Sequence, residues 1–268
     1  MQAKPRLAIS GLAKERIELW VNMAKTHDVD ELLIQRLLRK MDSVLANLPA
    51  NDKTVPWFYH EQGYLNAYRK RTTDVLRLFD LSIALGFHPV AAGLSKAHAL
   101  FICGEISMGR DVLEALEPDG ENHEEVESVA AACAHFGMFF KARALLQSIG
   151  KGADEMYNES LLAAQILEEA GIDDMEVTRR LNVAAGIVKS MTAHPLIAYS
   201  IFAMRDEGVL FRFVVKDSIE KIVQIDRAID ETMSAQFDGL VDEVLSIGVK
   251  PYAPNDANPV GGAYRVYL

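Results

Sequence analysis

Few side chains in this sequence are spaced so that they could act together in a reaction. The densest group of potential metal ligands is His123 with Glu124, Glu125 and Glu127. On a helix, His123 and Glu127 lie one turn apart and could share a metal ion, but two side chains do not complete a site. Acidic residues also favour the positive end of the helix dipole, which makes a helix start the simpler interpretation. We therefore predict no metal site and no cofactor.

The other candidate chemical motifs are incomplete. Residues 150–152 (Gly-Lys-Gly) lack the spacing and the Ser or Thr of a phosphate-binding loop, and residues 60–61 (His-Glu) lack the second histidine of a zinc-protease motif. Cys103 and Cys133 are interpreted as buried free thiols. No Ser/His/Asp group and no carboxylate pair can be singled out. We therefore predict no catalytic residue and favour a protein that is not an enzyme.

The composition is that of an acidic protein that can bury a sizeable core. The chain has 268 residues, 50% of them hydrophobic, and a formal net charge of −10. This charge argues against a nucleic-acid partner, because phosphate binding rests on Lys and Arg. The longest nearly uncharged run, residues 128–140, is too short to cross a membrane. With only two cysteines, we expect a cytoplasmic protein, and export by a signal-independent route is left open.

The elements that would position a site carry a repeated pattern of small residues. Three times an alanine precedes a glycine by seven residues, and the glycines are 33 and 34 residues apart. A fixed period in this range is typical of stacked helix pairs, none of which can bury its apolar face alone. The three alanine–glycine pairs are Ala97 and Gly104, Ala130 and Gly137, and Ala164 and Gly171.

This period resembles the tetratricopeptide repeat over about residues 90–191. The alanines match the eighth position of the family pattern and the glycines match the fifteenth. The small residue of the twentieth position is present as Gly109 and Ala142, but the third unit has Glu176 there. Four residues later the first two units have a leucine, whereas the third unit has Arg180. A non-repetitive helical bundle is the alternative. The helices predicted in this region are 90–103, 107–116, 123–135, 138–149, 155–170 and 173–191.

The resemblance implies that the first helix of each unit lines a concave groove. That groove would have an apolar end and an acidic flank, which suits a partner segment with a hydrophobic anchor beside Lys or Arg. The alternative is that the acidic residues are ordinary solvated helix residues. The partner-binding residues that the resemblance implies are Leu94, His98, Phe101, Glu124, Glu127, Gln165 and Glu168. In the third unit the groove positions are Asn158, Leu161, Gln165 and Glu168.

The segments on either side of the repeats predict two domains. Apolar residues at helical spacing precede the repeats, and β-branched and aromatic residues become frequent after residue 195. The predicted fold is mainly α: residues 1–195 form a helical domain with tetratricopeptide-like repeats from about residue 90, and residues 196–268 form a small α+β module. Outside the repeats we predict helices over 12–26, 29–48 and 57–85 (the last with a break near Gly63), a β-hairpin over 197–204 and 209–216 (a continuing helix is the alternative), helices from 217 and over 237–247, and a strand over 264–268.

These features favour a scaffold or adaptor that binds another protein, in a chaperone-like or regulatory role, without a nucleic-acid or membrane partner. Two alternatives stay open. In one, the C-terminal module binds a small ligand or catalyses a reaction, and the repeats deliver it to a target. In the other, the protein is a homo-oligomer in which residues 264–268 pair with a second copy through an open sheet edge. Neither the partner nor the pathway follows from the sequence.

Overall fold

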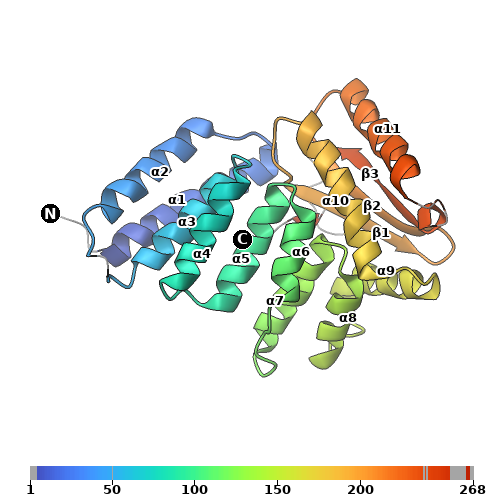
Figure 1. Ribbon diagram of the computed structural model, residues 1–268, viewed down its shortest axis with the longest axis horizontal. Coiled ribbons are helices and arrows are strands. Elements are labelled where there is room, and N and C mark those ends of the chain that lie inside the picture. The colour runs from blue at the N-terminus through green and yellow to red at the C-terminus, as the bar shows by residue number, and fades with distance from the viewer. Residues whose placement is uncertain (1–4, 50, 238, 240, 254–263, 266–268) are drawn as a thin grey trace.

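The computed structural model describes residues 5–49, 51–237, 239, 241–253 and 264–265, with the side chains of 5–8 and 264–265 left aside. Among the described residues the chain forms eleven α-helices and a small sheet (Figure 1). Helices α3 to α8 lie side by side in chain order, and the sheet and α11 lie beyond α9 and α10. The prediction of a mainly helical chain with strands near its C-terminal end is confirmed.

The described residues between 5 and 84 form four helices, where three were predicted. The long helix predicted over residues 57–85 is two helices, separated at Lys70, whose φ of 56° is left-handed. Gly63 marks no break. It lies inside α3, where a Cβ would be only 2.6 Å from the ring of Phe79 on α4, so a larger residue would force the two helices apart. These helices are α1 (Pro5–Thr26), α2 (Glu31–Leu45), α3 (Val55–Ala67) and α4 (Thr72–Ala84).

The six helices predicted in the repeat region are all present. The glycines that carry the period, Gly104, Gly137 and Gly171, have φ values of 77°, 72° and 71°, and each directly follows the residue that caps the first helix of its pair. Glycine suits this position because it adopts the left-handed conformation without strain. Membership of the tetratricopeptide family stays a prediction. The helices are α5 (Pro89–Ile102), α6 (Ile106–Glu114), α7 (His123–His135), α8 (Phe139–Ser148), α9 (Asn158–Glu169) and α10 (Asp174–Met191).

Helix α10 lies across the first turns of α6 and α8. The backbone N–H of Phe140, in the first turn of α8, donates to Asp174 at 3.0 Å, and that of Ser107, in the first turn of α6, donates to Asn182 at 3.0 Å. Neither of these helices has a side-chain cap from its own N-cap residue. Because the first N–H groups of a helix lack partners within it, α10 provides acceptors that the short helices do not have.

The same helix packs against two of the repeat glycines. A Cβ on Gly137 would be 2.5 Å from Val177, and a Cβ on Gly104 would be 3.3 Å from Lys189. Lys189 also pairs with Glu105 at 2.5 Å. The glycines therefore serve two purposes, since they end a helix and allow α10 to approach closely.

The C-terminal part forms a sheet with strand order β3-β2-β1-β4. The predicted hairpin is confirmed as the antiparallel pair β1 and β2, and Tyr264 and Arg265 pair with β1, while residues 266–268 lie outside the described residues. The helix predicted over 237–247 is wrong, because residues from Leu245 onward form β3, parallel to β2. The elements are β1 (Ala198–Met204), β2 (Gly208–Val215), α11 (Ile219–Gln236), β3 (Leu245–Pro251) and β4 (Tyr264–Arg265).

The helices and the sheet share one hydrophobic core. The backbone N–H of Leu196 donates to the carbonyl oxygen of Ile102 at 3.0 Å at the point where the chain leaves the helices. Phe101 of α5 lies with its ring centroid 5.5 Å from that of Tyr199 on β1. The predicted division into residues 1–195 and 196–268 stays a prediction, and the shared core implies that either part alone would expose apolar surface.

Candidate partner-binding surface

The apolar end of the predicted groove is covered by strands of the same chain. Phe101 is fully buried, and its ring lies 5.7 Å from that of His135, 5.5 Å from Tyr199 and 6.3 Å from Phe213. Strands β1 and β2 therefore occupy the position where the sequence placed a partner's hydrophobic anchor. In this conformation Phe101 cannot contact another protein.

His98 belongs to the same covered region. Its ring stacks on that of His135 at 5.3 Å, and Nδ1 of His135 lies 2.8 Å from the hydroxyl of Tyr199. Burial lowers the pKa of His98 to about 4 and lowers that of His135 well below its usual value. Both rings are therefore neutral at neutral pH, and they act as packing groups between α5, α7 and β1. Leu94 is partly buried against the same core.

The predicted acidic flank is largely neutralised within the chain. Glu127 pairs with Lys151 at 2.6 Å and accepts a hydrogen bond from the hydroxyl of Tyr157, and these contacts lower its pKa. Glu168 pairs with Arg143 at 2.9 Å, which lowers the pKa of Glu168. Glu124 is exposed near the start of α7. Of the three acids, two are thus held by cations that the sequence analysis did not connect with them.

One part of the predicted groove lines a real hollow. Gln165 and Glu168 face a space of about 490 Å³ between α8 and α9, together with Asn158 and Leu161, the remaining groove positions of the third unit. The structure therefore brings these positions together, but it does not join them to Leu94, His98 and Phe101. The hollow is lined by Arg143, Gln147, Gly152, Ala153, Asn158, Leu161, Leu162, Gln165 and Glu168.

A larger hollow, of about 730 Å³, lies between α1 and α2 and was not anticipated from the sequence. Apolar residues of both helices form part of its lining, and Arg36, Arg39 and Lys40 of α2 also line it. The available signal was Leu32. Leu32 is one of the apolar residues at helical spacing in the helix predicted over residues 29–48, yet it is 81% exposed.

A buried polar chain connects α1, α3 and α5. Nε of Arg16 donates to Glu61 at 2.7 Å, Nδ1 of His60 lies 3.2 Å from Glu61, and Nε2 of His60 lies 2.9 Å from the hydroxyl of Ser95. The order Ser, His, carboxylate is that of a nucleophilic triad. Here, however, the guanidinium of Arg16 already neutralises Glu61, whose pKa is lowered by contacts with His60 and Arg16. We interpret the chain as a structural link between three helices.

A small hollow of about 250 Å³ lies between α10 and the C-terminal elements α11 and β3. Its lining includes Arg180, which is fully buried and donates to Glu176 at 2.8 Å and to Asp242. Burial and the nearby carboxylates raise the pKa of Asp230 on its rim. Glu176 and Arg180 are the two positions at which the third unit departs from the repeat pattern. Arg180 connects α10 to Asp242, and Glu176 accepts a hydrogen bond from Arg180.

No family model, curated protein or solved structure matches the chain. Across the described residues, no helix combines the length and the apolar character that a membrane span needs. Within that same part of the chain, no three His, Cys, Asp or Glu side chains are grouped so that they could hold a metal ion.

Proposed function

We propose that this protein is a non-enzymatic scaffold or adaptor that binds a segment of another protein in the hollow between α8 and α9. The observation that carries this proposal is that Asn158, Leu161, Gln165 and Glu168, the groove positions of one repeat unit, line one hollow of about 490 Å³. The tetratricopeptide-like period of the helix pairs supports it, because stacked pairs use this face for extended peptides. Its role is chaperone-like or regulatory, and we place it in the cytoplasm.

The lining of the hollow indicates the chemistry of the partner. Leu161 and Leu162 provide an apolar contact for a hydrophobic anchor, and Glu168 provides a carboxylate for a neighbouring Lys or Arg. The side chain of Glu168 is 60% exposed in its pair with Arg143. The carboxylate of this pair is open to solvent, so a cation of the partner can approach Glu168 beside Arg143.

Affinity capture from native lysate tests this proposal when it compares matched variants. Gln165→Trp fills the hollow, and Glu168→Lys reverses its charge. Glu121→Lys, at an exposed position outside the hollow, makes the same charge change as a control. We expect both hollow variants to lose the same captured proteins while the control retains them, with thermal unfolding unchanged in all three. An identical set of captured proteins for all variants would contradict the proposal.

A further inference from the structure

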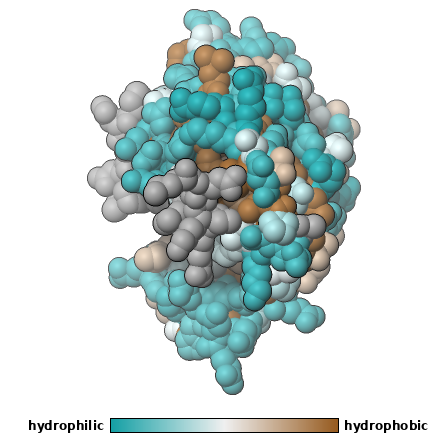
Figure 2. Space-filling model, turned by 90° about the vertical axis from the view of Figure 1, so that its left-hand side faces the viewer, coloured by the Kyte–Doolittle hydropathy of each residue, from teal (hydrophilic) through white to brown (hydrophobic). Residues whose placement is uncertain are grey.

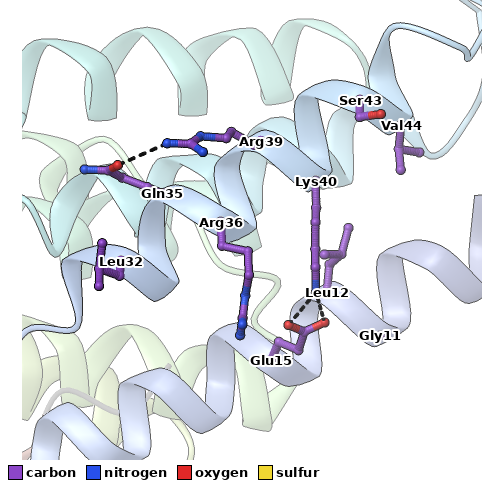
Figure 3. A pocket seen from close by; sticks show the side chains of 10 residues that line it. All are labelled: Gly11, Leu12, Glu15, Leu32, Gln35, Arg36, Arg39, Lys40, Ser43 and Val44. Atoms are coloured by element: carbon purple, nitrogen blue, oxygen red, sulfur yellow. Dashed lines mark hydrogen bonds and ion pairs between the residues drawn. The ribbon is translucent and has the colours of Figure 1, made fainter.

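The hollow between α1 and α2 combines an apolar floor with a cationic rim (Figure 3). Leu12 and Val44 contribute apolar surface, and Leu32, at 81% exposure, stands at one end. In Figure 3, Arg36 extends from α2 across the hollow toward α1. The hollow is lined by Gly11, Leu12, Glu15, Leu32, Gln35, Arg36, Arg39, Lys40, Ser43 and Val44.

The cations of this rim are only partly neutralised. Lys40 pairs with Glu15 at 2.8 Å. Arg39 reaches the side-chain oxygen of Gln35, which is uncharged, at 3.4 Å. Arg36 forms no ion pair or hydrogen bond through its side chain with the described residues. Neither Arg36 nor Arg39 is therefore paired with a carboxylate of the described residues, and Glu15, the carboxylate that lines the same hollow, is held by Lys40.

Gly11 provides a second, independent observation. A glycine inside a helix is less stable than alanine by roughly 0.5–1 kcal/mol, so it usually has a packing reason. Gly63 and Gly109 have such a reason, since an aromatic ring fills the space beside each, whereas Gly186 of α10 is as open as Gly11 but lines none of the three hollows described above. No atom lies within 4 Å of a Cβ built on Gly11, which is exposed and lines the hollow. The chain itself does not use this space, which leaves the backbone of α1 open to the close approach of another helix.

We propose that this hollow binds an amphipathic helix of another protein, whose apolar residues are flanked by Asp and Glu. The lining along α2 runs from Leu32 to Val44, about 18 Å at 1.5 Å per residue, which matches a helix of about 12 residues. An apolar stripe would cover the floor and Gly11, and its carboxylates would pair with Arg36 and Arg39. Arginine binds carboxylates through two parallel hydrogen bonds, which favours this charge pattern.

A helix fits this surface better than a lipid bilayer does. Figure 2 shows the side of the molecule on the left of Figure 1, and the hydrophobic surface in view there lies in patches among hydrophilic side chains. The site is separate from the hollow between α8 and α9, so this proposal does not depend on the function proposed above.

Fluorescence anisotropy with the full chain tests this proposal. The probes are two synthetic helical peptides of about 16 residues with leucines at the i, i+3, i+4 and i+7 positions. One carries Glu beside the leucines and the other carries Lys. We expect the Glu peptide to bind at least about tenfold more tightly than the Lys peptide, and added salt to weaken its binding. Arg36→Glu with Arg39→Glu should reduce its affinity by about tenfold or more, and Gly11→Leu, which fills the hollow, should abolish binding.

Matched controls separate this effect from a general change in the protein. Gly186→Leu places the same side chain on an exposed, open glycine of α10, and Arg77→Glu with Arg227→Glu makes the same charge change elsewhere. Both controls should bind the Glu peptide like the wild type, as should Gln165→Trp in the α8–α9 hollow. Equal binding of the two peptides, or binding unchanged in the Arg36/Arg39 variant, would overturn the proposal.

Two further results would replace the partner helix with another occupant. Flotation with vesicles of phosphatidylserine and phosphatidylcholine, lost in the Arg36/Arg39 variant, would overturn the proposal in favour of a lipid surface. Self-association in sedimentation velocity, lost in the same variant, would overturn it in favour of a second copy of the chain. We expect neither, and a monomer that ignores vesicles but binds the Glu peptide is the supporting result.

Discussion

The carboxylate of Asp174, in the first turn of α10, accepts hydrogen bonds from the backbone N–H of Phe140, in the first turn of α8, at 3.0 and 3.2 Å. It also accepts one from the N–H of Lys141 at 3.1 Å. Met138, the N-cap residue of α8, makes no such bond with its own side chain. The cap of one helix is therefore contributed by a residue 34 positions later in the chain.

Replacing Asp174 with Ala should destabilise the fold. Loss of an N-cap acceptor reduces the free energy of unfolding by about 1–2 kcal/mol, because the N–H groups of α8 lose their partner. Urea denaturation followed by circular dichroism measures the change. Asp111→Ala, at an exposed position of α6, serves as the control and should be nearly neutral. Equal midpoints for the two variants would show that the cap contributes nothing.

Two glycines in helices should respond to alanine with opposite signs. A Cβ on Gly109 would overlap the ring of Phe136, which is fully buried and cannot move aside. Gly109→Ala should therefore lower the free energy of unfolding by about 1–3 kcal/mol. Gly186 has no atom within 4 Å of a Cβ, so Gly186→Ala should raise it by about 0.5–1 kcal/mol. Thermal unfolding of the two variants side by side checks both signs.

Mild acid should destabilise the contact between the repeats and the sheet. Burial lowers the pKa of His98 from 6.5 to about 4, so the folded chain keeps this ring neutral while the unfolded chain protonates it. Its contribution is fully present above pH 6.5 and is lost as the pH falls from 6.5 toward about 4. His135, whose pKa is lowered in the same direction, adds to the fall.

The pH dependence can be assigned to these rings by substitution. Urea midpoints measured from about pH 7 to about pH 5 should fall less steeply in His98→Leu than in the wild type, because one protonation of the unfolded state is removed. His123→Leu, at an exposed position of α7, should fall as the wild type does. Parallel curves for all three proteins would refute the assignment.

Arg180 should matter far more than its neighbour on α10. It is fully buried, donates to Glu176 at 2.8 Å and to Asp242, and lies 4.6 Å above the ring of Phe237. Arg180→Ala leaves two half-buried carboxylates, Glu176 and Asp242, without their cation and should lower the free energy of unfolding by about 1.5–3 kcal/mol, since solvent reaches both carboxylates. Arg179→Ala, at an exposed position, should change it by less than about 1 kcal/mol. Chemical denaturation distinguishes the two.

The repeat helices could be predicted because their signals are local. The helix predicted over 123–135 is the helix observed, and Gly137 follows it in a left-handed conformation. Apolar periodicity and a glycine beyond the last turn act within a few residues of each other, so no distant contact is needed to interpret them. The two elements predicted wrongly lacked such signals. Lys70 adopts a left-handed conformation, which its residue type does not predict. Residues 245–251 form a strand by pairing with β2, which lies far from them in the sequence.

The site residues were less predictable than the helices, because each depends on a partner far away in the chain. Glu127 and Glu168 lie on the helices where the sequence placed them, but their cations, Lys151 and Arg143, come from other segments. Phe101 lies on the predicted face of α5, but β1 and β2 cover that face.

The amino-acid sequence alone determined where the helices of the repeat region begin and end and which of their residues are small, since spacing along one helix decides both. The tertiary structure alone decided which surfaces stay open. In the folded chain the sheet covers Phe101, Arg180 of α10 pairs with Asp242, and the hollow between α1 and α2 is left uncovered by the described residues. The physical reason is that a segment is buried only by contact with another segment. A stripe of apolar residues predicts that some surface covers it, but the packing of the whole chain decides which surface that is.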